Sequence, residues 1–202
     1  MFSSYRRAIS TADLYSAVIV LVRHWTVAIT KDLGISYTRT EDSRSNSPYG
    51  FTDSDWAGDT GDRKSTGGYT FLLANAAVSW KSKKQNIVAL SSTEAEYIAC
   101  SEAAKEAIWI RRLYSELLTK TSPSAPILLY ADNQSAVQLV KNNRFHERTK
   151  HIDTKYHHVR DTLAQGLITI EHISTHDMTA DILTKALVRE THWKHLHRLG
   201  LF

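Results

Sequence analysis

The spacing of apolar residues changes along the chain, and each change marks a different kind of predicted element. Residues 1–29 carry an apolar run with helical character, and the polar stretch at 37–48, rich in Ser, Arg, Thr and Asp, predicts a linker. From Tyr49 onward, short apolar stretches punctuated by Gly, Asp and Asn predict three consecutive strands. We expect these strands at residues 50–57, 67–73 and 77–80. Three short consecutive strands favour an antiparallel meander.

Beyond the meander, the pattern alternates between helices and strands. Residues 91–118 contain no Pro or Gly and are rich in Ala, Glu and Leu, which predicts a long helix. The later elements are expected as a buried strand at 127–131, helices at 133–140 and 152–164, a strand at 167–173, and helices at 180–187 and 191–199. A meander followed by this alternation predicts an α/β fold, with a mixed sheet flanked by helices.

Aromatic residues of the meander are candidates for the core. Tyr69 and Phe71 alternate within the second expected strand, and we assign both to the core. Trp80 alternates with Val78, so we expect it to be buried as well. The lysines at 81, 83 and 84 leave contact between Trp80 and nucleic acid as the alternative.

Composition narrows the class of protein. The chain has 202 residues, of which 42% are hydrophobic, so it can bury a sizeable core. Its single cysteine, Cys100, excludes an internal disulfide and a thiolate zinc cluster, which fits a reducing compartment. The longest apolar stretch, residues 17–22, ends at Arg23, far short of the roughly 20 residues that cross a bilayer. We therefore expect no membrane span.

Positive charge is concentrated in one segment. The formal net charge is +4, and residues 141–160 hold six Lys or Arg and four His but only two acids. Such a segment is either a solvated face or a surface for a polyanion. Composition alone favours the solvated face.

Three aspartates lie where a sheet could gather ligands for a hard cation such as Mg²⁺, which requires oxygen donors. Asp53 and Asp55 are two apart on the first strand, so they share a face. Asp132 directly follows the buried strand at 127–131, the end at which open α/β sheets place their ligands. The alternative is that Asp132 is the N-cap of the next helix.

Two glutamates begin the long helix, within two overlapping capping boxes, Ser91 to Glu94 and Thr93 to Glu96. Because they are two apart, they cannot share a face. Glu96 lies on the same side as a stripe of small residues, which would let the helix approach the sheet closely, so Glu96 is the one expected to point toward the strands. A capping role for Glu96 remains open. Asp181 lies among apolar residues and could equally be a first-turn charge that favours the helix dipole.

Seven motifs occur in a fixed order between Tyr49 and Leu187. They are FTDSDWAGD, DRKSTGGYTF, AVSWKSKKQ, ALSSTEAEYIA, YADNQSA, RTKHIDTKYHHVRD and ADILTK. Together they resemble the RNase H domain of Copia-type LTR retrotransposon polyproteins, which lies C-terminal to reverse transcriptase. The resemblance implies an RNase H-like fold with a five-stranded mixed sheet, and an RNA–DNA hybrid as the substrate.

The resemblance also implies a site of four carboxylates. Matched motif by motif, the catalytic and metal-binding residues fall on Asp53, Glu96, Asp132 and Asp181. They would hold two Mg²⁺ ions, for which Mn²⁺ can substitute, with Asp53 bridging both ions, Glu96 and Asp132 completing one and Asp181 the other. Nothing in the spacing excludes Asp55 as a further ligand.

Other residues are implied as contacts to nucleic acid. The basic segment is part of a family motif, so its Arg148, Lys150, His151 and Lys155 become candidates for contact with hybrid phosphates. His176, five residues before Asp181, is a candidate for the same surface and for proton transfer. Its alternative is an exposed loop histidine.

The resemblance gives a domain organisation and a setting. Residues 49–187 would be the RNase H-like domain, 188–202 a C-terminal helical tail, and 1–48 an atypical extension and linker, in which TKDLGISY resembles the connection to reverse transcriptase. A reverse transcriptase in cis or in trans would be the partner, in a cytoplasmic particle with the nucleus as the alternative. Against an active nuclease stands a catalytically silent module that still binds nucleic acid.

Overall fold

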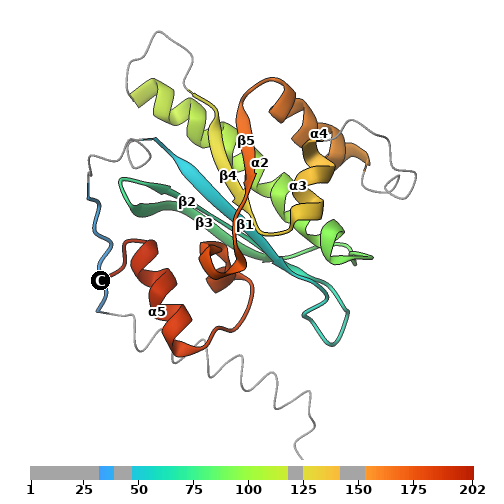
Figure 1. The fold of residues 1–202 in the computed structure, drawn as a ribbon, viewed down its shortest axis with the longest axis horizontal. Coiled ribbons are helices and arrows are strands. Elements are labelled where there is room, and N and C mark those ends of the chain that lie inside the picture. The colour runs from blue at the N-terminus through green and yellow to red at the C-terminus, as the bar shows by residue number, and fades with distance from the viewer. Residues whose placement is uncertain (1–31, 39–46, 118–124, 142–152) are drawn as a thin grey trace, which may run out of the picture. The chain divides into compact units, whose positions relative to one another are not determined.

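A five-stranded mixed sheet forms the centre of the computed structural model, which describes residues 32–38, 47–117, 125–141 and 153–202 (Figure 1). Its strands are β1 (Tyr49–Asp55), β2 (Thr66–Leu73), β3 (Ala76–Lys84), β4 (Ile127–Ala131) and β5 (Ile168–His172). They lie in the order β3-β2-β1-β4-β5. The first three strands are antiparallel, whereas β4 pairs parallel to both β1 and β5. The predicted meander and mixed α/β sheet are therefore confirmed.

Helices connect and cover these strands. The α-helices are α2 (Ser92–Leu117), α3 (Gln134–Lys141), α4 (Asp153–Ala164) and α5 (Arg189–Arg198), and the short 3-10 helices are η3 (Thr175–Asp177) and η4 (Thr179–Leu183). The prediction of a helix at 180–187 is wrong, because only the short 3-10 helix η4 forms there. After this turn Thr184 donates a hydrogen bond to Asp53, a contact over 131 positions that outweighs the local helical pattern.

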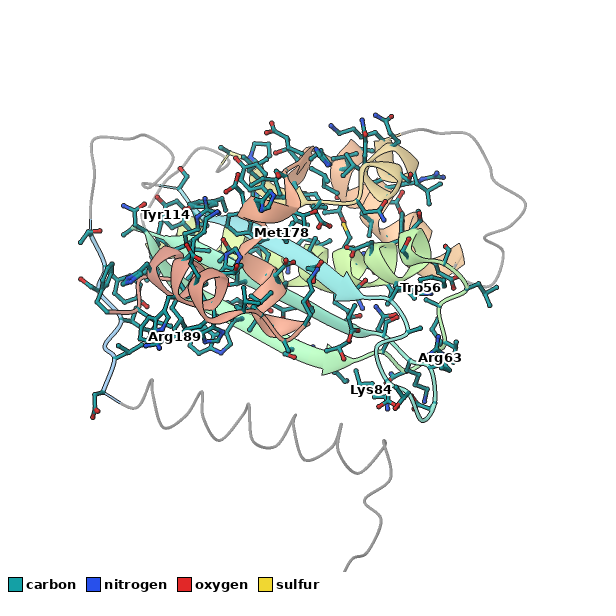
Figure 2. The ribbon with its side chains drawn as sticks, turned by 60° about the horizontal axis from the view of Figure 1, so that its bottom comes forward. Trp56, Arg63, Lys84, Tyr114, Met178 and Arg189 are labelled. Atoms are coloured by element: carbon teal, nitrogen blue, oxygen red, sulfur yellow. The ribbon has the colours of Figure 1, made fainter. Side chains whose placement is uncertain are left out.

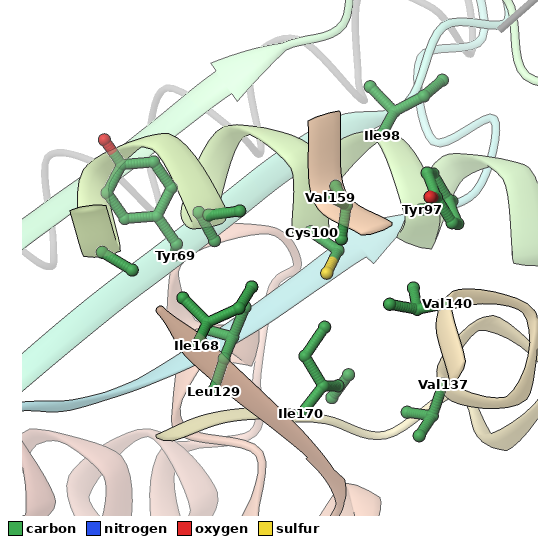
Figure 3. Packing of buried hydrophobic residues seen from close by; sticks show 14 of the residues in the cluster. Tyr69, Tyr97, Ile98, Cys100, Leu129, Val137, Val140, Val159, Ile168 and Ile170 are labelled. Atoms are coloured by element: carbon green, nitrogen blue, oxygen red, sulfur yellow. The ribbon is translucent and has the colours of Figure 1, made fainter. Parts of the chain in front are cut away.

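The face of the sheet under α2 holds the larger part of the core. Figure 3 shows side chains of α2, β2, β4 and β5 that meet there, with Tyr69 and Leu129 among them. Tyr69 and Phe71 are buried, as predicted. The small residues of α2 allow close approach, since a Cβ built on Gly67 of β2 would lie 3.4 Å from the Cβ of Ala99. The predicted small-residue face of this helix therefore packs directly on the sheet.

The opposite face carries a smaller cluster. Its buried members are Phe51, Leu72, Ala77, Met178, Ala180 and Leu199. Met178, labelled in Figure 2, is completely buried between η3 and η4. The C-terminal end of the chain lies in this layer and is bonded to the segment before β1, because the backbone N–H of Ser36 donates a hydrogen bond of 2.8 Å to the carbonyl oxygen of Gly200. Gly200 is required there, since its φ is 78° and an added Cβ would lie 2.5 Å from that of Ala76.

Trp80 is not a core residue, and that prediction is wrong. Its side chain is 58% exposed and that of Val78 is 39% exposed. Both lie on β3, which is one of the two edge strands, so only β2 flanks them in the sheet. A two-residue alternation identifies a strand, but it does not reveal whether the strand has a neighbour on both sides.

No helix in the described part of the chain is both long enough and apolar enough to span a membrane.

Candidate metal-binding site

Three aspartates from distant parts of the sequence meet at one edge of the sheet. Asp53 lies near the end of β1, Asp132 directly follows β4, and Asp181 lies in η4. Each offers a carboxylate oxygen, and these oxygens all lie within 4.8 Å of one another. The parallel register explains two of the three, because Thr52 pairs with Ala131 and the residues that follow are then neighbours. Asp53 is 1% exposed and Asp181 5%.

Glu96 reaches the same place from α2. One of its oxygens accepts hydrogen bonds from the backbone N–H and the hydroxyl of Ser54, at 3.0 and 3.2 Å. Its other oxygen, Oε2, is buried and has no hydrogen-bond partner among the described residues. Since Ser54 directly follows Asp53, this contact places the glutamate beside the three aspartates. Three of the four acids named from the sequence are thus brought together as one group, and Glu96 is not a member of that group but is bonded to the residue next to Asp53.

The neighbouring Glu94 has a different role. Its side chain accepts a hydrogen bond of 2.8 Å from the N–H of Leu90, and its own N–H donates to the hydroxyl of Ser91 at 3.2 Å. The bond to Ser91 is one half of the first predicted capping box, whereas the carboxylate of Glu94 accepts its bond from Leu90, the residue before the cap. Ser91 and Glu94 thus stabilise the start of the helix, and Glu96 faces the strands.

Asp132 is not the cap of the helix that follows it. That position belongs to Asn133, whose side-chain oxygen accepts a hydrogen bond of 2.9 Å from the N–H of Ala136. Asp132 instead accepts a bond of 2.9 Å from the hydroxyl of Thr175, in η3. The capping alternative considered for Asp132 is therefore wrong, and η3 orients this carboxylate.

Asp55 lies outside the group of three aspartates. Its carboxylate accepts a hydrogen bond from the N–H of Thr66, across the start of the β1–β2 hairpin. The turn folds so closely around it that a Cβ on Gly58 would lie 2.0 Å from its oxygen. Asp55 therefore stabilises the hairpin.

Sequence reasoning missed two residues of the site, Thr184 and Lys185. The Thr184 hydroxyl donates to Oδ2 of Asp53. The ammonium of Lys185 lies 3.4 Å from Oδ1 of Asp53 and 3.0 Å from Oδ1 of Asp181. The only available signal was that both belong to the ADILTK motif, because the predicted helix would have placed them differently.

Burial and mutual repulsion disfavour the charged form of these acids. Burial, together with the charges of Asp53 and Asp132, raises the pKa of Glu96 to about 9. Burial and the charge of Asp53 raise the pKa of Asp181 to about 6. The pKa of Asp53 is also raised by burial, although Lys185 opposes that shift. The site is therefore short of positive charge.

Of the five residues that the resemblance implies as contacts to nucleic acid, only His176 has a described side chain. It is exposed in η3, next to the Thr175 that holds Asp132, and its carbonyl oxygen accepts a bond of 2.8 Å from Lys194. Lys155 lies in α4, but its side chain is outside the described part of the structure. Arg148, Lys150 and His151 lie outside the described residues altogether.

Curated relatives with similar sequences are polyproteins of transposons. The retrovirus-related Pol polyprotein from transposon TNT 1-94 of Nicotiana tabacum is 46% identical over 140 residues, which are 69% of this chain and 10% of that protein. The Pol polyprotein from transposon RE2 of Arabidopsis thaliana is 39% identical over 191 residues, or 95% of this chain and 13% of that protein. The chain thus spans about a tenth of the length of these relatives. No protein-family model matches it.

Comparison with solved structures supports the fold. LC11-RNase H1, isolated from compost by a metagenomic approach, superposes with a TM-score of 0.50 at 16% identity and covers 75% of this chain and 99% of its own. At that identity the likeness concerns the fold alone. The five-stranded sheet and its helices have the RNase H-like arrangement.

Proposed function

Because the chain belongs to the family of Copia-type retrotransposon Pol polyproteins and folds as an RNase H-like domain, we propose that it hydrolyses the RNA strand of RNA–DNA hybrids with the help of Mg²⁺. One observation carries the proposal. Carboxylates from β1, the end of β4 and η4 converge on one edge of the sheet, although 128 positions separate Asp53 from Asp181, and Glu96 of α2 is bonded to Ser54, the residue next to Asp53.

The side chains fit a hard divalent cation. Each donor is a carboxylate oxygen, the ligand type that Mg²⁺ prefers. Burying several carboxylates together is unfavourable unless positive charge compensates them. Oε2 of Glu96 is buried without a hydrogen-bond partner among the described residues, as expected of an oxygen whose natural ligand is a cation.

In the proposed mechanism Asp53, Glu96, Asp132 and Asp181 hold the metal, and their neighbours fix each carboxylate in position. When bound, divalent cations lower the pKa of water and neutralise charge on a phosphate. Ser54 orients Glu96 and Thr175 orients Asp132, so both acids are positioned before substrate binds. Hydrolysis at such a site would act on the phosphate backbone and not on the bases, so we expect selectivity to come from the 2′-hydroxyl and the minor groove of the hybrid.

Three further parts belong to the proposal. The basic segment at 141–160 would contact the phosphates of the hybrid. A reverse transcriptase domain, in cis or in trans, would supply the hybrid, and the particle in the cytoplasm would be the place of action.

Cleavage of an RNA strand annealed to DNA tests the function. In Mg²⁺ the wild type is expected to cut, and Glu96→Gln and Asp132→Asn are each expected to lose at least about 100-fold in rate, since each removes a proposed metal ligand. Glu94→Gln is the matched control, because it makes the same change two residues away and a glutamine can still accept the capping bond.

A wild type without activity would contradict the proposal. If that inactive protein still bound the hybrid in a salt-dependent way, the silent binding module would be favoured. Equal cleavage by the wild type and Asp132→Asn would assign the observed activity to a different site.

A further inference from the structure

The only cation in contact with the aspartate group of the described structure comes from the chain itself. Lys185 places its ammonium 3.4 Å from an oxygen of Asp53 and 3.0 Å from an oxygen of Asp181. Its side chain is 36% exposed, whereas those of the two acids are 1% and 7% exposed. The side chain of Lys185 thus extends inward from the solvent, and the ammonium group at its end compensates the negative charge of the two buried aspartates.

Position distinguishes this pair of contacts from the other ion pairs of the described residues. Lys84 with Asp59 and Lys105 with Glu102 have both partners at least 39% exposed. Such surface pairs contribute little to stability. Lys185 instead contacts two of the three aspartates whose oxygens lie within 4.8 Å of one another, where repulsion is greatest in the absence of a metal.

The two oxygens of Asp53 are held by different groups. Oδ1 faces Lys185, and Oδ2 accepts a hydrogen bond from the buried hydroxyl of Thr184. Thr184 could therefore keep Asp53 oriented if the lysine left. A lysine is suited to leaving, because its ammonium is a single compact charge on a flexible stem, whereas an arginine would bind a carboxylate with two parallel hydrogen bonds.

We propose that Lys185 is an internal counter-ion, which holds Asp53 and Asp181 together before a divalent cation binds and gives up its place when the cation arrives. The inference rests on the proposed metal site. It predicts that the lysine stabilises the metal-free protein and competes with the metal. Lys185 is thus a positioning residue, which sets how much metal the domain requires.

Titration of the full 202-residue chain with Mn²⁺, without nucleic acid, tests this competition. Free Mn²⁺ is followed by electron paramagnetic resonance, and thermal unfolding is measured in chelator. Lys185→Met is expected to bind Mn²⁺ about three to ten times more tightly than the wild type, because a competing positive charge is gone. Its metal-free melting temperature is expected to fall. Lys105→Met, which removes an equal charge from an exposed pair, is expected to change neither quantity.

An affinity of Lys185→Met for Mn²⁺ that equals the wild-type value, or lies below it, would overturn the inference. If this variant does not fold without metal, Lys185→Gln and Lys185→Arg decide. Glutamine is expected to tighten binding, and arginine is expected to leave it unchanged or weaken it; the reverse order contradicts the competition. A wild type that binds no Mn²⁺ refutes the metal site itself, an outcome distinct from equal binding by the wild type and Lys185→Met.

Discussion

The two faces of the sheet differ in what they bury. Among the described residues, a cluster of 19 buried apolar residues lies under α2, whereas the face covered by η4 and α5 has a cluster of six. Asp53 lies on the second face, two residues from Phe51, and Asp181 joins it from η4. The large cluster can supply most of the stability, which leaves the edge of the other face free to hold repelling charges. The difference separates most of the folding core from the three aspartates, while the fourth proposed ligand, Glu96, comes from α2 over the first face.

The largest effect is expected from truncation of the face under α2. Phe71 is completely buried, and its ring packs against Gly50, where an added Cβ would lie 2.5 Å from the ring and where no side chain is present to fill the space that it leaves. Phe71→Ala is expected to lower the free energy of unfolding by about 3 to 5 kcal/mol, measured by urea denaturation. Trp80→Ala, on the exposed edge strand, is expected to change it by less than about 0.5 kcal/mol. Equal losses would show that the exposed edge strand contributes as much as this cluster.

At the carboxylates, substitution is expected to raise the free energy of unfolding, whereas Phe71→Ala lowers it. In metal-free buffer at pH 7, Glu96→Gln is expected to raise the free energy of unfolding by about 1 to 3 kcal/mol, since it removes a buried acid that the folded state disfavours in its charged form. Because the pKa of Glu96 is raised to about 9, the penalty grows as pH rises above the unfolded value and is absent at pH 4. Glu94→Gln should stay within about 0.5 kcal/mol of the wild type. Destabilisation by Glu96→Gln would contradict the account of a strained site.

A smaller loss of stability, at acidic pH, is expected where α5 meets the second face. His195 is fully buried, and its ring nitrogens have no hydrogen-bond partner among the described residues. Burial lowers its pKa to about 4. Between pH 6.5 and 4 the unfolded chain binds more protons, so stability is lost as pH falls through that window, by about 1 to 2 kcal/mol. The free energy of unfolding of His195→Leu, measured by chemical denaturation, should fall less over the same pH range than that of the wild type. Identical pH profiles of the two proteins would refute the role of His195.

Much of the first face could be predicted from the sequence, because its signals are local. Apolar periodicity and small residues placed α2 on the sheet, and the same facing argument selected Glu96 over Glu94. The antiparallel meander and the mixed character of the sheet followed from the three consecutive strands and the alternation after them. Local pattern and tertiary packing agree on this side of the domain.

The second face was harder to predict, because its contacts connect distant residues. Thr184 reaches Asp53 across 131 positions, and that bond accompanies a 3-10 turn where the pattern indicated a helix. The exposure of Trp80 follows from the position of β3 at the sheet edge, which is a property of the whole sheet. Lys185 could be recognised only once Asp53 and Asp181 had been brought together.

A crystal structure of the full chain soaked in Mn²⁺, with anomalous scattering recorded, would show whether these carboxylates bind a metal. We expect an anomalous peak about 2.0 to 2.3 Å from oxygens of Asp53 and at least two of Glu96, Asp132 and Asp181, because these carboxylates are arranged as ligands of a hard cation. A well-ordered site without such a peak at millimolar Mn²⁺, with Lys185 still in contact with both aspartates, would contradict it.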